Sequence, residues 1–193
     1  MMRIVTGSAR GVRLATLEGE ATRPTSERVK QAVFSSIQFN IEGRTVLDLF
    51  AGSGQMELEA LSRGAESAMF VDSSAEAMEI IKKNIEKCRF GDRSRTLISD
   101  YRNYIRKAKG KYSFDLIFID PPYASGSAVD AAKRCIEAGI AAPGCIFVCE
   151  SSEARDAESC EELARRVTFL KTAQYGRTTG ISIFLLNPEE EEA

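Results

Sequence analysis

The chain has 193 residues, of which 44% are apolar and 28% are charged, and its formal net charge is −2. That length is enough for one well-buried domain with a modest appendage. The sequence contains no histidine, which excludes a Ser-His-Asp or Cys-His nucleophile and a histidine-ligated metal.

The N-terminal part of the chain is basic, with six Lys or Arg residues against three acids in the first 40 residues. Segments 3–6 and 12–17 predict two short strands around a glycine-containing turn. We therefore expect a basic β-hairpin extension over residues 1–21. A turn at 22–26 then leads into a helix that runs to about Phe39.

After Gly43 the sequence alternates between apolar strands and amphipathic helices. Runs such as 116–119 are apolar on both faces, which is typical of a parallel sheet covered by helices on both sides. The pattern predicts an α/β, Rossmann-like domain over residues 22–187, with a seven-stranded, mostly parallel sheet. An acidic, disordered tail is expected at 188–193. The expected strands are 45–50, 67–72, 95–100, 114–120, 144–150, 167–173 and 180–186, and the expected helices are 55–63, 74–88, 101–108, 127–139 and 158–165.

A glycine-containing loop follows the first of these strands and leads straight into a helix. Glycines there permit a sharp turn and a close approach of the backbone to a ligand. Acids end the next two strands, where carboxylates can accept hydrogen bonds from ribose hydroxyls and from an adenine amine. We predict a nucleoside-cofactor site from this loop and these two strand ends: Asp48, Phe50, Gly52, Gly54, Asp72, Ser73, Asp100 and Tyr101.

Two cofactors compete for this site. A loop that binds NAD requires a third glycine where this chain has Glu57, and a carboxylate there would oppose a pyrophosphate. S-adenosylmethionine (SAM) carries no phosphate, and Asp48 suits its cationic amino-acid end. We therefore favour SAM. The alternative that the strand-end acids are only structural caps stays open.

The run Asp120-Pro121-Pro122-Tyr123 closes the fourth strand. Consecutive prolines donate no N–H and leave their carbonyls free, so Asp120 and the Pro121 carbonyl can receive both hydrogens of an exocyclic amine. Tyr123 can stack on the base that bears this amine. We expect Asp120, Pro121 and Tyr123 to be catalytic, with Pro122 and Tyr123 contacting the substrate base. An ordinary Pro-Pro turn is the alternative.

Several further motifs occur together with these two: Arg3-Ile4 with Gly7 and Arg10-Gly11, the segment 22–29, the segment 59–65, Glu150, and Tyr175-Gly176. With them, nearly the whole chain resembles the RsmD-type 16S rRNA (guanine966-N2)-methyltransferase family. The glycine loop and Asp-Pro-Pro-Tyr occur in many amino-methyltransferases, so they indicate only this broad class. The segment 22–26, together with the basic N-terminus, is what makes the resemblance specific to the RsmD-type family. The chain departs from the family at Asp72, where relatives often carry Glu, and at Gln55-Met56, where smaller residues are common.

The resemblance implies SAM-dependent methylation of the N2 amine of a guanine in 16S rRNA, within an assembling or assembled small ribosomal subunit. It also implies that the N-terminal part helps to hold RNA, through Arg3, Arg10, Arg13, Arg23 and Arg28. Two alternatives remain. One is a DNA adenine-N6 methyltransferase, and the other is a non-catalytic RNA-binding assembly factor.

The remaining sequence features suggest no further site. The five cysteines include no C-x-x-C pair, so neither a zinc site nor a disulfide framework is indicated, and no metal is expected. The N-terminus lacks the apolar block of a secretory signal and no stretch approaches a membrane span, so we expect a cytoplasmic protein, which need only be a monomer. A second basic cluster contains no acid, although such runs are usually solvated faces: Arg102, Arg106, Lys107, Lys109 and Lys111.

Overall fold

The structure, a computed structural model, describes residues 2–16, 27–122 and 126–188. Within these ranges the centre is a seven-stranded sheet in the order β3-β2-β1-β4-β5-β7-β6. β7 runs antiparallel to both of its neighbours, and the other pairs are parallel. The predicted mostly parallel sheet is therefore confirmed. Its strands are β1 (Thr45–Asp48), β2 (Ser67–Asp72), β3 (Ser94–Ile98), β4 (Phe114–Ile119), β5 (Ala141–Ser151), β6 (Val167–Tyr175) and β7 (Thr179–Leu186).

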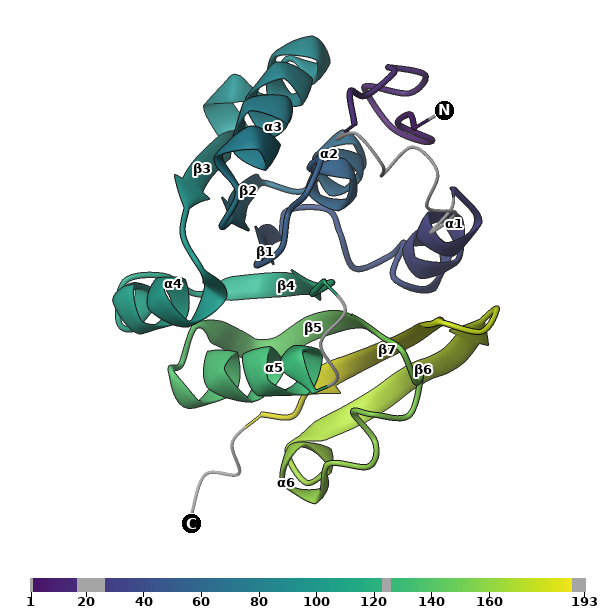
Figure 1. The fold of residues 1–193 in the computed structure, drawn as a ribbon, viewed down its shortest axis with the longest axis vertical. Coiled ribbons are helices and arrows are strands. Elements are labelled where there is room, and N and C mark those ends of the chain that lie inside the picture. Colours follow the sequence, from purple (N-terminus) through teal and green to yellow (C-terminus); the bar gives the residue numbers. More distant parts are fainter. Residues whose placement is uncertain (1, 17–26, 123–125, 189–193) are drawn as a thin grey trace.

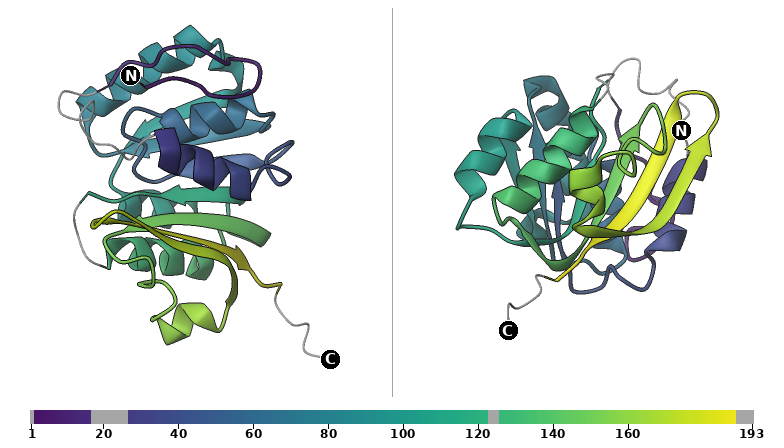
Figure 2. Two further views of the ribbon diagram at one scale, coloured as in Figure 1. Left: turned by 90° about the vertical axis from the view of Figure 1, so that its right-hand side faces the viewer. Right: turned by 90° about the horizontal axis from the view of Figure 1, so that it is seen from below.

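Helices cover both faces of this sheet, as Figures 1 and 2 show. Successive strand residues point to opposite faces, so Val46 enters one apolar core and Leu47 enters the other. The first core is closed by α1 (Glu27–Ser36), α2 (Gln55–Ser62) and α3 (Ala75–Cys88), and the second by α4 (Tyr101–Ala108), α5 (Ser127–Glu137) and α6 (Glu161–Ala164). A 3-10 turn, η2 (Gly91–Arg93), precedes β3.

The carboxyl ends of β1 to β4 meet at one edge of the sheet. Asp48, the last residue of β1, lies opposite Phe70 of β2 and Phe118 of β4. Asp72, the last residue of β2, lies opposite Ile98 of β3. The loops that follow these four strands are therefore neighbours, at the edge where open α/β sheets bind ligands.

The N-terminal segment, residues 2–16, lies against α2 and α3 (Figure 1). The two expected strands are reduced to a single antiparallel bridge between Arg3 and Arg13. The segment is anchored by buried side chains instead of by a long ladder. Ser62 Oγ accepts from the Ala9 N–H at 3.0 Å, and Asn84 Oδ1 accepts from the Ala15 N–H at 2.8 Å. The two arms still pair locally, because the N–H groups of Ile4, Gly11 and Leu14 donate to the carbonyls of Val12, Ile4 and Met2, and side chains of the helices hold the rest of the segment.

Some predicted boundaries shift. The helix expected to reach Phe39 ends at Ser36, and the chain then turns as Asn40 N–H donates to Ile37 O at 2.8 Å. Turns over residues 154–159 shorten the helix expected at 158–165 to α6. The predicted turn at 22–26 and most of the acidic tail lie outside the described residues. Among the described helices, none combines the length and apolar character needed to cross a membrane.

Candidate active site

The loop after β1 is built around two glycines in left-handed conformations. Gly52 has φ 54° and Gly54 has φ 77°. A Cβ on Gly54 would lie 3.1 Å from the Phe70 ring, so a larger residue there meets both backbone strain and a packed neighbour. The loop is fixed to β2 because Asp72 accepts hydrogen bonds from the Gly52 N–H at 2.9 Å and from the Ser74 N–H at 2.8 Å.

This loop forms one wall of a cleft of about 320 Å³ at the carboxyl edge of the sheet. The cleft unites the ends of β1, β2 and β4 with the segment after β3, as the sequence predicted. Two predicted residues, Gly54 and Pro121, do not line the cleft. The predicted residues that do line it are Asp48, Phe50, Gly52, Asp72, Ser73, Asp100, Tyr101, Asp120 and Pro122.

Asp100 is placed differently from the expectation. It lies beyond the end of β3 and is the N-cap of α4, where its carboxylate accepts from the Asn103 N–H at 3.0 Å. This backbone hydrogen bond is the main reason that the pKa of Asp100 is lowered. The capping role that the sequence left as an alternative is therefore present, and the exposed carboxylate still faces the cleft.

An aromatic pair forms another part of the wall. The Phe50 and Tyr101 rings are tilted, with their centroids 5.2 Å apart. The Tyr101 hydroxyl donates to Asp130 of α5 at 2.7 Å, and Arg134 also donates to Asp130 at 2.8 Å. These contacts fix the ring of Tyr101 at the start of α4, so the cleft has a flat apolar surface next to its acids.

Two buried carboxyl groups lie beneath the cleft. Asp48 is 3% exposed, and burial, together with the charges of Asp120 and Asp72, raises its pKa to about 8. The Phe50 N–H donates to Asp48 at 2.8 Å and partly opposes this shift. Glu57 of α2 is fully buried, and neither of its carboxyl oxygens has a hydrogen-bond partner among the described residues. Burial, and then the charge of Asp48, raise the pKa of Glu57 well above its usual value.

The Asp-Pro-Pro-Tyr corner is described as far as Pro122. Asp120 is exposed immediately after β4, and Pro122 lines the cleft beside it. A smaller cavity of about 40 Å³ adjoins this corner and is lined by Asp120, Lys30 and Glu150. Tyr123, which we expect to contact the base, lies outside the described residues.

The sequence interpretation missed a buried ion cluster beside this corner. Lys30 is 3% exposed and donates to the Arg3 carbonyl at 2.6 Å, while its Nζ lies 3.7 Å from a carboxylate oxygen of Glu59. Glu59 also pairs with Arg63 at 2.8 Å and accepts from the Thr6 N–H at 3.0 Å. Burial is the main cause that lowers the pKa of Lys30. The i,i+4 spacing of Glu59 and Arg63 was the only signal of this cluster in the sequence.

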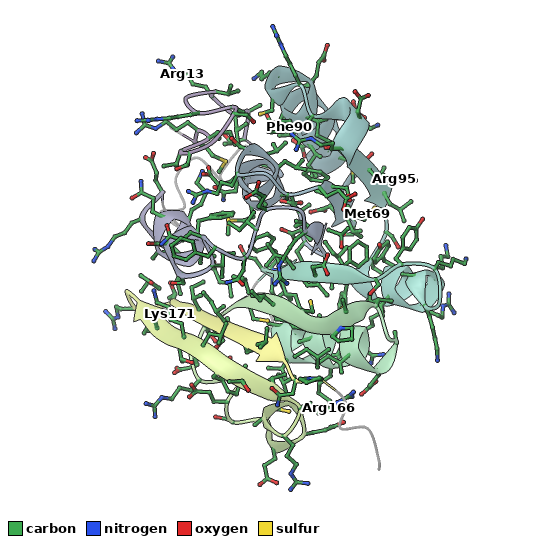
Figure 3. All side chains as sticks on the ribbon, turned by 180° about the vertical axis from the view of Figure 1, so that it is seen from behind. Arg13, Met69, Phe90, Arg95, Arg166 and Lys171 are labelled. Atoms are coloured by element: carbon green, nitrogen blue, oxygen red, sulfur yellow. The ribbon has the colours of Figure 1, made fainter. Side chains whose placement is uncertain are left out.

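None of the four predicted RNA-contacting arginines in the described residues lines the cleft. Arg3, Arg10 and Arg13 are exposed on the N-terminal segment, and Arg28 is exposed on α1. Arg3 pairs with Glu27 at 2.8 Å. Arg13 points outward from the protein body, as Figure 3 shows. The N-terminal segment reaches the cleft only through Met2, and Arg23 lies outside the described residues.

Comparisons with known proteins agree with this architecture. A family model described as "Conserved hypothetical protein 95" matches residues 2–183. The "Putative rRNA methyltransferase YlbH" of Bacillus subtilis is 38% identical over 123 residues, which are 63% of this chain and 67% of that protein. The "Ribosomal RNA small subunit methyltransferase D" of Haemophilus influenzae is 29% identical over 153 residues, 79% of each chain.

A solved structure described as "Putative methyltransferase yhhF from Escherichia coli" has the same fold. Its TM-score is 0.85 at 24% identity, over 97% of this chain and 99% of that one. Together with the sequence matches, this shows that the chain belongs to the family described as conserved hypothetical protein 95, the RsmD-type methyltransferases.

Proposed function

We propose that this protein uses SAM to methylate the exocyclic N2 amine of a guanine in small-subunit ribosomal RNA. One observation carries the proposal: the cleft at the carboxyl edge of the sheet is lined by four aspartates and by no Lys or Arg among the described residues. Such a wall suits a cationic ligand and opposes the pyrophosphate of a dinucleotide. The cleft therefore favours SAM over NAD on charge as well as on the loop sequence.

The residues of the cleft fit SAM in size and chemistry. A volume of about 320 Å³ lies in the range of small-molecule sites. Asp72 and Asp100 offer acceptors for ribose hydroxyls and an adenine amine, although part of each carboxylate already accepts backbone N–H groups. The Phe50 and Tyr101 rings supply an apolar surface. Asp120 supplies negative charge after β4, and the Asp48 carboxyl at the end of the adjacent β1, whose pKa is raised to about 8, can ionise beside a bound cation.

SAM, when bound, supplies a methyl group on a sulfonium, and the protein has to orient the base amine towards it. We assign this task to Asp120 and the Pro121 carbonyl, which accept the two amine hydrogens and direct the nitrogen lone pair. A new N–C bond forms while the C–S bond breaks, and its electron pair stays on sulfur. One amine proton then leaves the nitrogen, and Asp120, exposed at the end of β4, is the acceptor that we assign.

The RNA substrate is supported by the family and by the exposed arginines. Relatives are named as rRNA methyltransferases, and Arg3, Arg10, Arg13 and Arg28 present positive charge outside the acidic cleft. We assign these side chains to phosphate contacts, together with Arg23. We further propose that the protein acts on the small subunit in the cytoplasm, and that guanine N2 is the acceptor, as the family resemblance implies.

Methyl transfer from isotopically labelled SAM tests the proposal, with unmethylated small ribosomal subunits, their naked 16S rRNA and duplex DNA as acceptors. Mass analysis of the digested nucleosides identifies the product. We expect N2-methylguanosine from the ribosomal substrates and no labelled DNA. Label confined to adenine N6 in DNA would overturn the substrate assignment, and absence of transfer to every acceptor would overturn the enzymatic one.

A further inference from the structure

A second hollow of about 500 Å³ lies away from the active-site cleft, between α4 and the edge strand β3. We call it the α4 groove. Arg95 and Leu97 of β3 lie opposite Met69 and Val71 of β2, which belong to the core on the α4 side of the sheet. Both β3 side chains therefore face α4, and Figure 3 shows Arg95 and Met69 side by side on the two strands.

The charge of the α4 groove is entirely positive. Its nine lining residues include Arg95, Lys107 and Lys111 and no acid. All three cations are exposed, and no Asp or Glu in the described part of the chain forms an ion pair with any of them. Like charges held together without a counterion repel one another, so an anionic partner would stabilise this arrangement.

The floor of the α4 groove is apolar and aromatic. Leu97 is 42% exposed and Tyr112 is 41% exposed, so both present apolar surface to solvent. One face of the Tyr112 ring is stacked on Phe114, with centroids 6.1 Å apart. The hydroxyl of Tyr104 is buried in the wall without a hydrogen-bond partner among the described residues. The groove thus offers cations for phosphates and an aromatic ring for a base.

Helix α4 connects this groove to the active site. Its first residue, Tyr101, lines the cleft, and Lys107 and Ala108 in its last turn line the groove. Eight residues of α-helix span about 12 Å, a distance that a few nucleotides of an extended strand cover. A strand whose target base enters the cleft can therefore reach the groove with its flanking nucleotides.

We propose that the α4 groove binds a single-stranded segment of the RNA substrate next to the target nucleotide. Arg95, Lys107 and Lys111 contact phosphates, and Tyr112 stacks on one base. The inference rests on the proposed RNA substrate and adds a contact surface separate from the N-terminal arginines. A protein partner fits less well, because lysine is depleted from the cores of protein–protein interfaces.

The test measures binding of a fluorescent oligouridylate of about 16 nucleotides, a length within the usual range for single-strand sites. This probe contains no guanine, so its binding is independent of whether methyl transfer occurs. The groove variant is Arg95→Ala/Lys107→Ala/Lys111→Ala. The matched control, Lys82→Ala/Lys83→Ala/Lys87→Ala, removes the same charge from exposed positions on α3, on the other side of the sheet. Thermal unfolding midpoints verify that both variants fold.

We expect the groove variant to bind at least tenfold more weakly than the wild type, and the control to stay within about threefold. The slope of log affinity against log salt should fall by about 2, because each single-strand phosphate contact contributes about 0.7. Tyr112→Leu should weaken binding about fivefold or more at constant charge. Equal losses in groove and control variants, or no loss in either, would overturn the proposal. So would a groove variant that binds naked RNA normally but fails to bind small subunits, because the groove would then contact a protein.

Discussion

Asp48 and Asp120 end neighbouring strands but lie in opposite environments. Asp48 is 3% exposed and its pKa is raised to about 8, chiefly by burial. Asp120 is exposed in the cleft mouth beside Pro122. A bound cation favours ionisation of a buried acid with a raised pKa. An exposed carboxylate is instead accessible to a substrate that enters from solvent. We therefore assign the cofactor's charge to Asp48 and the acceptor amine to Asp120.

A substitution at Asp120 tests whether this residue acts on the acceptor amine and not on cofactor binding. Asp120→Asn keeps the size of the side chain but loses the charge that accepts the amine hydrogens, so we expect turnover to fall by about 100-fold or more. The dissociation constant for SAM should stay within about threefold of the wild type. Single-turnover kinetics and calorimetry measure the two quantities. Asp92→Asn, an exposed position before β3, is the control, and full activity of the Asp120 variant would refute the assignment.

The raised pKa of Asp48 predicts pH-dependent cofactor binding. Glu57, Asp120 and Asp72 surround this carboxyl, and the charges of the two aspartates help to keep it protonated near pH 7. A cationic ligand binds the ionised form better, so SAM affinity should rise from about pH 6 to about pH 8, by at most about tenfold per pH unit. Asp48→Asn cannot titrate, and its affinity should change less over the same range. Calorimetry at several pH values tests this, and identical slopes for both proteins would contradict it.

At the scale of elements, α2 joins the cleft to the N-terminal segment. Glu57 on this helix is oriented towards Asp48, whereas Glu59 and Ser62 hold the backbone of residues 5–9. Gly7 permits no larger residue without conflict, because a Cβ at this position would lie 1.8 Å from the Ser62 carbonyl oxygen. The position of the basic N-terminal segment is therefore set by the same helix that follows the glycine loop.

Breaking this anchor should release the N-terminal segment. Glu59→Gln leaves the buried Lys30 without its charged partner, and we expect the free energy of unfolding to fall by about 3–5 kcal/mol. Amide exchange at Val5 and Thr6, which donate to Glu59, should accelerate. Glu79→Gln breaks only the exposed pair with Lys82 and should cost less than about 1 kcal/mol. Equal stability of the two variants in urea titrations would show that Glu59 is not the anchor.

The sequence predicted elements whose signal is local. Apolar runs on both faces identified the parallel strands, and the acids after them marked the cleft, because strand ends in such a sheet meet at one edge. The sequence-based prediction failed where contacts between distant segments decide which hydrogen bonds form. The pairing of residues 3–6 with 12–17 stays short, with one bridge and a few backbone hydrogen bonds, and Glu59, Ser62 and Asn84 bond other N–H groups of the segment. Residues with no neighbouring motif, such as Lys30, gave no sign of their burial.

At the scale of the whole molecule, charge is divided between surfaces. Acids line the cleft, whereas basic side chains lie on the N-terminal segment and in the α4 groove. This division suits an enzyme that holds a cationic donor inside and a polyanion outside. The net charge of −2 does not reveal this division of charge. The fold shows it, because basic segments that are distant in the sequence lie on either side of the acidic cleft.

The most direct measurement of the central claim is a crystal structure of the protein with S-adenosylhomocysteine, the product left after methyl transfer. We expect the nucleoside to lie along Asp72 and Asp100, and the sulfur to lie between the end of β1 and the Asp120-Pro122 corner. A ligand bound elsewhere, or one whose sulfur is remote from Asp120, would contradict the account.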